Sequence, residues 1–161
     1  MKWSKHTSYG TPDYLYKALE MEFGFDLDPC PLNLDFDPTV DQDGLKLNWN
    51  GHRVFCNPPW NTVMPWVEKA FASKALTVFL LPARTDTAWF HMLNDSGAEI
   101  RLFRKRVHFL RDGIDDKKSP TDGTMLAVVR RMNAQGADLP VSKPFVWTEA
   151  MQVGGTVELG T

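Results

Sequence analysis

Short apolar runs recur along this chain and predict the strands of a sheet. The run at residues 76–81 is apolar at nearly every position, which is typical of a central strand buried on both faces. Further strands are expected at residues 25–27, 54–56, 100–103, 125–129 and 145–147. Pro, Gly or Asp residues bound most of these runs and mark where the strands end.

Between the runs, apolar residues recur with helical spacing and predict three helices. The first is expected to begin with Thr11 as its cap and Pro12 at its first helical position, and to end at Gly24. A second helix is expected to begin near Pro65. A third is predicted over residues 85–97, opened by a Thr-Asp cap and closed by a glycine.

The alternation of strands with helices predicts an α/β fold with a mainly parallel sheet and crossover connections. In such sheets, ligands bind beyond the carboxyl ends of the strands. Polar side chains follow three of the predicted strands, namely Asp28, Asn57 and Arg84. We therefore expect these side chains to lie at one edge of the sheet and to face one crevice.

Composition restricts the class of protein. A chain of 161 residues forms one domain that buries about 70% of its unfolded surface, and 43% hydrophobic residues indicate a core rather than disorder. The formal net charge of −2 means that a nucleic acid would have to meet a local basic patch. Cys30 and Cys56 are expected to be buried thiols in a reducing compartment. Neither a signal peptide nor a membrane span is visible, which indicates a soluble, cytoplasmic protein.

The strand at residues 54–56 leads into a rigid turn that carries chemistry. Pro58 and Pro59 can continue neither a central strand nor a helix, so the turn holds Asn57 and Trp60 at a strand end. The Asn57 amide oxygen and the Pro58 carbonyl could accept both hydrogens of one exocyclic amino group. Trp60 could stack on the ring that bears it, a contact worth about 1–3 kcal/mol. The alternative is an ordinary Pro-Pro loop with a surface tryptophan.

A basic cluster lies in the segment 104–123, which could form a hairpin that grips phosphates. Its basic residues and their near neighbours are Arg101, Arg104, Lys105, Arg106, His108, Arg111, Lys117 and Lys118. Arg84 could hold the phosphate beside a target base, or it could form an internal ion pair. An ordinary charged hairpin is the alternative for the whole cluster.

No metal site is expected. Aspartates alternate at residues 26 and 28, 35 and 37, and 41 and 43, but they lack the spacing of a calcium-binding loop. The four histidines are scattered without the spacing of metal ligands.

Several motifs together resemble one family. Residues 57–60 are similar to the (D/N/S)-P-P-(Y/F/W) motif of S-adenosylmethionine-dependent amino-methyltransferases. Residues 11–12 and 25–30 resemble elements around the cofactor strand of adenine-N6 methyltransferases, and residues 43–45 resemble the segment that contacts the cofactor's adenine. Residues 80–91 are very similar to a block of small phage-encoded DNA adenine methyltransferases. The resemblance to this phage or prophage (Dam-like) family runs over roughly residues 3–131.

The resemblance implies one Rossmann-like domain over residues 1–161, with an abbreviated, mainly parallel sheet and helices on both faces. Its core would span residues 11–131, followed by a tail at 133–161. It implies S-adenosylmethionine as methyl donor, no metal, double-stranded DNA as partner, and a monomer or weak dimer in the cytoplasm of a bacterial host. The family's glycine-rich turn is missing, and the segment between Cys30 and Val54 is too short for a full helix-strand-helix unit.

The resemblance also assigns roles to individual residues. Catalytic roles fall to Asn57, Pro58, Pro59 and Trp60. Cofactor contacts fall to Thr11, Pro12, Asp28, Pro29, Cys30, Asp41 and Asp43. DNA contacts fall to Arg84, Arg104, Lys105, Arg106 and Arg111.

The expected reaction is methylation of an adenine flipped out of duplex DNA, without a strong general base. The same tetrad would serve cytosine N4, RNA adenine or protein glutamine, because each presents a planar conjugated NH₂. A nucleic-acid-binding protein with a decayed cofactor site is the alternative from a different class.

Overall fold

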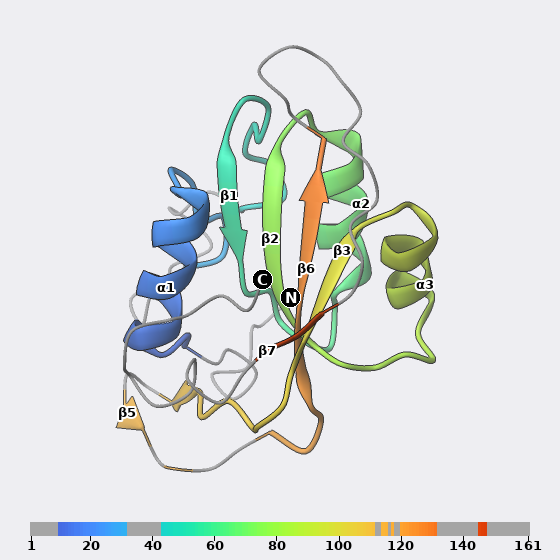
Figure 1. Ribbon diagram of the computed structural model, residues 1–161. Coiled ribbons are helices and arrows are strands. Elements are labelled where there is room, and N and C mark those ends of the chain that lie inside the picture. Colours follow the sequence, from blue (N-terminus) through green and yellow to red (C-terminus); the bar gives the residue numbers. More distant parts are fainter. Residues whose placement is uncertain are drawn as a thin grey trace.

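The computed structural model describes residues 10–31, 43–111, 114–115, 117, 120–131 and 145–147, the last range by its backbone alone. Its helices are α1 (Asp13–Phe23), α2 (Met64–Ala72) and α3 (Ala88–Asp95). Its strands are β1 (Arg53–Cys56), β2 (Leu76–Pro82), β3 (Glu99–Phe103), β4 (Leu110–Arg111), β5 (Ile114–Asp115), β6 (Thr124–Arg130) and β7 (Phe145–Trp147). The α/β class predicted from the sequence is therefore confirmed (Figure 1).

The main sheet is mixed, with five strands in the order β1-β2-β6-β3-β7. Strands β1, β2, β3 and β7 run parallel, and β6 lies antiparallel between β2 and β3. The prediction of a mainly parallel sheet therefore has to be corrected at β6. The described part of the connection from β3 to β6 contains no crossover helix, so the chain turns back at the carboxyl edge and β6 must run in the opposite direction.

The strand predicted at residues 25–27 is present only as a single bridge, in which Leu27 pairs with Val54 in parallel. The Phe55 N–H donates to the Leu27 carbonyl at 2.9 Å, and the Asp26 N–H donates to the Arg53 carbonyl at 3.0 Å. Pro29 has no N–H and follows directly, so the pairing stops after Leu27. This short contact nevertheless brings Asp28 to the carboxyl end of β1.

Two of the predicted helix starts are displaced by one or two residues. The N-cap of α1 is Pro12, and no side-chain hydrogen bond caps this helix, so Thr11 is not the cap. The N-cap of α3 is Thr87, whose hydroxyl accepts from the Phe90 N–H at 3.3 Å, and not Thr85. At the other end of α1, Gly24 adopts a left-handed conformation with φ 63°, as the predicted C-terminal glycine should.

Helices cover both faces of the sheet, as the resemblance implied (Figure 1). Along β2, Phe79 and Leu81 point to the face packed by α2 and α3, while Val78 and Leu80 point to the face packed by α1. The alternating side chains of a strand explain why one apolar run feeds two cores. None of the described helices has the length and apolar character needed to cross a bilayer.

A buried ion network lies between α1 and β3. The Arg101 guanidinium, in a residue that is only 5% exposed, donates to both Glu22 carboxylate oxygens at 2.7 and 2.5 Å and also to Glu99. Arg130 donates to the second Glu99 oxygen at 2.7 Å. Arg101 was expected in the basic cluster, and this expectation is wrong, because its strand position turns the side chain towards α1.

Candidate active site

The carboxyl ends of the parallel strands meet at one edge of the sheet. The parallel pairing of Leu27 with Val54, and of β1 with β2, places Asp28, Asn57 and Arg84 along this edge, as predicted. Thr124 at the start of β6 pairs with Pro82, so the loop before β6 joins the same edge. These residues define the candidate active site.

Asn57 follows β1 and is half-buried, while Pro58 and Pro59 are buried. The amide nitrogen Nδ2 of Asn57 donates to the Thr11 hydroxyl at 3.2 Å. The NH₂ end of the Asn57 amide is therefore hydrogen-bonded to Thr11, which lies just before α1.

Trp60 is 8% exposed, so the alternative of a surface tryptophan is wrong. Its Nε1 donates to the Leu80 carbonyl at 3.3 Å, and its ring meets the Phe109 ring edge-on at a centroid distance of 5.1 Å. These contacts make the indole an anchor that fastens the Pro-Pro turn to β2. Stacking of Trp60 on a target base stays a prediction, and little of the indole ring is exposed in this structure.

Arg84 forms the internal ion pair that was one of its two alternatives. Its Nε and Nη2 donate to Asp122 Oδ2 at 2.9 and 2.7 Å, and its Nη1 donates to the Trp60 carbonyl at 3.2 Å. One guanidinium thus ties the Pro-Pro turn to the loop before β6. Sequence reasoning had no signal for Asp122, because the two residues lie 38 positions apart.

Asp28 carries a perturbed carboxyl group. Burial raises its pKa to about 6, although a hydrogen bond from the Cys30 N–H to Oδ1 at 3.0 Å opposes the shift. Burial, with the nearby charges of Asp28 and Asp43, raises the pKa of Cys30 to about 12. The fully buried Cys56 also has its pKa raised, first by burial. Both cysteines are free thiols, and the prediction that they are buried is confirmed for Cys56, whereas Cys30 is only partly buried.

Asp43 lies near Asp28 and Cys30 because the loop that contains Gly44 approaches the loop that contains Pro29 closely. A Cβ added to Gly44 would lie 1.8 Å from the Pro29 carbonyl oxygen, so the two backbones touch. The Gly44 carbonyl accepts from Nε1 of the fully buried Trp49 at 3.0 Å. The resemblance drew attention to residues 43–45, but nothing in the sequence indicated that Gly44 meets Pro29 or accepts a hydrogen bond from Trp49. Asp41 lies outside the described residues.

We predict that Gly44→Ala destabilises the protein by about 1–3 kcal/mol, because the new methyl group forces the two loops apart. Urea unfolding followed by circular dichroism measures this change. Gly123→Ala is the matched control, since its added Cβ would meet only the Ala83 Cβ, at 3.8 Å. Equal midpoints for the two variants would contradict the tight contact at Pro29.

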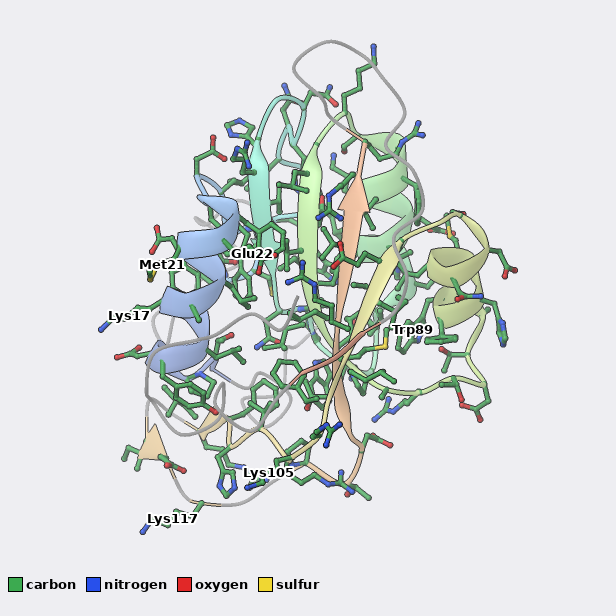
Figure 2. All side chains as sticks on the ribbon, in the orientation of Figure 1. Lys17, Met21, Glu22, Trp89, Lys105 and Lys117 are labelled. Carbon is green, nitrogen blue, oxygen red and sulfur yellow. The ribbon has the colours of Figure 1, made fainter. Side chains whose placement is uncertain are left out.

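The basic segment, defined here as residues 104–111, alternates between exposed and buried positions. Arg104, Lys105 and Arg106 are exposed, while Val107 and Phe109 are buried against the α1 face of the sheet. Arg106 donates to the carbonyls of Pro120, at 3.1 Å, and Thr121. Figure 2 shows Lys105 and Lys117 projecting at the same end of the molecule.

The hairpin predicted within residues 104–123 is present in part. Strands β4 and β5 pair antiparallel, with Leu110 opposite Asp115, and Arg111 at this hairpin is exposed. Lys118 lies outside the described residues. Within the described part of the chain, no group of three or more His, Cys, Asp or Glu side chains is placed to hold a metal ion.

Comparison with known proteins gives two matches. The family model described as DNA N-6-adenine-methyltransferase (Dam) matches residues 2–152. The chain is 25% identical over 139 residues to a DNA N-6-adenine-methyltransferase of Haemophilus phage HP1 (strain HP1c1), and the match covers 80% of each chain. No solved structure matches significantly.

Proposed function

Since this chain belongs to the DNA N-6-adenine-methyltransferase (Dam) family and is a DNA adenine methyltransferase, we propose that it methylates the N6 atom of an adenine flipped out of duplex DNA, with S-adenosylmethionine as donor. The observation that carries this proposal is the Asn57 amide, held in a rigid turn on the strand edge that also carries Asp28. We also propose that the mixed sheet is an abbreviated Rossmann-like fold and that the gene is of phage or prophage origin.

Asn57 and Pro58 are proposed to orient the target amine. The Asn57 amide oxygen and the Pro58 carbonyl accept the two N6 hydrogens, which turns the nitrogen lone pair outward. When bound, S-adenosylmethionine supplies an electrophilic methyl group on a sulfonium. Orientation of two bound reactants then accounts for most of the rate, and the methylated nitrogen loses its extra proton to water.

The cluster at residues 28–30 and 43 has chemistry that fits this donor. Asp28 is a partly desolvated carboxylate with a pKa raised to about 6, and a positive charge beside it would be favourable. S-adenosylmethionine carries such charges on its sulfonium and its amino group. Asp43 adds a second carboxylate for hydroxyl or NH₂ donors. Pro29 and Cys30 would shape the turn, and Pro12, the N-cap of α1, is proposed as a further cofactor contact.

Double-stranded DNA is proposed to lie against the basic segment. Arg104, Lys105 and Arg111 are exposed and supply local positive charge to a chain of net charge −2. Arg84 and Arg106 are already hydrogen-bonded to the loop before β6, through Asp122 and the Pro120 carbonyl. They are proposed to contact phosphates while keeping these hydrogen bonds.

We predict that Arg104→Ala weakens DNA binding several-fold and reduces the slope of log K against log salt by about 0.9. The reason is that one exposed guanidinium neutralises one phosphate and releases its counterion. Fluorescence anisotropy with a labelled duplex at several salt concentrations measures the slope. Lys17→Ala, on the exposed side of α1, is the control that should leave it unchanged (Figure 2). An unchanged slope for Arg104→Ala would remove this residue from the interface.

The reaction itself is tested by incubating the protein with tritiated S-adenosylmethionine and plasmid DNA, followed by long-read mapping of modified bases. We expect N6-methyladenine at one recurrent sequence. Methylation of cytosine N4, or incorporation into RNA or protein but not DNA, would overturn the proposal. Calorimetry with S-adenosylmethionine distinguishes an active methyltransferase from a nucleic-acid-binding protein with a decayed cofactor site, because the decayed site would give no binding heat.

A further inference from the structure

Thr11 sits where a helix cap would be expected but does not cap α1. The N-cap of α1 is Pro12, and no side-chain hydrogen bond closes the helix start. The Thr11 hydroxyl instead accepts from Nδ2 of Asn57, a residue 46 positions further along the chain, at 3.2 Å. A group that sequence patterns assign to a helix start or to the cofactor is therefore in contact with the catalytic tetrad.

This contact bears on which end of the Asn57 amide faces the target base. An amide side chain has a donor end and an acceptor end, and rotation by a half turn exchanges them. In the structure the Thr11 hydroxyl accepts from the NH₂ end of the amide, so Oδ1 lies on the other side. In the reversed orientation, the NH₂ group of Asn57 would face the N6 amino group of the adenine, and N6 would lose Oδ1 as its hydrogen-bond acceptor.

Thr11 is also tied to the basic segment. Its neighbour Gly10 exchanges two backbone hydrogen bonds with Leu110, each 2.8 Å long. The preceding residue of the basic segment, Phe109, packs edge-on against Trp60. The basic segment thus reaches both ends of the tetrad, one end through Gly10 and Thr11 and the other through Phe109.

We infer that Thr11 is a positioning residue, which orients the Asn57 amide and links it to the basic segment, rather than a ligand of the methyl donor. This inference rests on the proposed function. It assigns Thr11 to the chemical step, so that loss of its hydroxyl should change turnover and leave donor affinity intact.

The test compares Thr11→Val, which keeps the shape and removes the hydroxyl, with Thr11→Ser, which keeps the hydroxyl. With both substrates saturating, Thr11→Val should lower kcat by about 10- to 100-fold, while Thr11→Ser should stay within about threefold of wild type. Calorimetry should give an S-adenosylmethionine affinity within about twofold of wild type for both variants, because the donor site is untouched. In nuclear magnetic resonance spectra, the Asn57 side-chain NH₂ signal should shift in Thr11→Val only.

Thr77→Val is the matched control for the same chemical change. The Thr77 hydroxyl is buried, has no hydrogen-bond partner among the described residues, and lies at the end of β2 away from the site. Its removal should leave kcat unchanged and the thermal midpoint equal or higher. If Thr11→Val does not fold, Thr11→Ala replaces it in every arm.

Three results would overturn the inference while wild type is active: a Thr11→Val kcat equal to that of wild type, an equal loss in Thr11→Ser and Thr11→Val, or a tenfold weaker donor affinity with unchanged kcat. A wild-type protein that transfers no methyl group to DNA overturns the proposed function itself, and the role of Thr11 with it.

Discussion

Asn57→Ala should lower kcat for methyl transfer to DNA by about 100- to 1000-fold, the cost of losing one preorganised polar group at a reacting centre. The substitution removes the amide oxygen proposed to accept from N6, and the adenine is then free to rotate away from the methyl donor. The turn itself should persist, because two hydrogen bonds that hold it do not involve the Asn57 side chain. Trp60 Nε1 donates to the Leu80 carbonyl, and Arg84 donates to the Trp60 carbonyl.

Single-turnover transfer of tritiated methyl groups to plasmid DNA measures the loss. Asn94→Ala, at an exposed position of α3, is the matched control and should retain wild-type turnover. Asn57→Asp keeps an oxygen acceptor, so its turnover should lie between that of Asn57→Ala and that of wild type. Equal incorporation by wild type and Asn57→Ala would refute the role assigned to this residue.

Asp28→Asn should weaken S-adenosylmethionine binding by at least about tenfold at pH 8, because the variant loses the negative charge proposed to face a cation. The same substitution should stabilise the protein without donor at this pH. The pKa of Asp28 rises from 3.8 to about 6 on folding, so ionisation costs free energy in the folded state. The resulting gain for the asparagine variant is about 1–3 kcal/mol.

The sign of the pH dependence follows from this raised pKa. The contribution of Asp28 to stability is complete below its unfolded pKa and is lost as the pH rises through about 6, so the two proteins should converge in stability at low pH. Donor affinity behaves in the opposite way, because only the carboxylate attracts a cation. Wild-type affinity should fall as the pH drops below about 6, and that of Asp28→Asn should stay nearly flat.

Calorimetric titrations between pH 5 and 8, with thermal unfolding of both proteins over the same range, test these expectations. Asp95→Asn, which changes an exposed carboxylate at the end of α3, is the control for a general effect of charge. An identical pH dependence of donor affinity in wild type and Asp28→Asn would show that this carboxylate does not meet the donor's charge.

The linear pattern of the chain was sufficient for most of the scaffold. The apolar run at residues 76–81 became β2, and the turn after β1 placed Asn57 at the sheet edge, because strand burial and proline geometry are local properties. The same reasoning brought Asp28 to this edge, although the segment before it forms only one bridge. The direction of β6 was not encoded locally, since it depends on where the preceding connection leaves the sheet.

What only the tertiary structure decided is which partner each polar side chain meets. Thr11 holds Asn57 instead of capping α1, and Arg84 holds Asp122. Arg101 is buried against Glu22, 79 positions away, although the cations at residues 104–106 are exposed. A long side chain chooses among groups that folding brings near it, and neither periodicity nor local propensity contains those distances. By itself, therefore, the sequence determined most strands of the main sheet and the tetrad at the end of β1, while the folded chain determined how the tetrad is held.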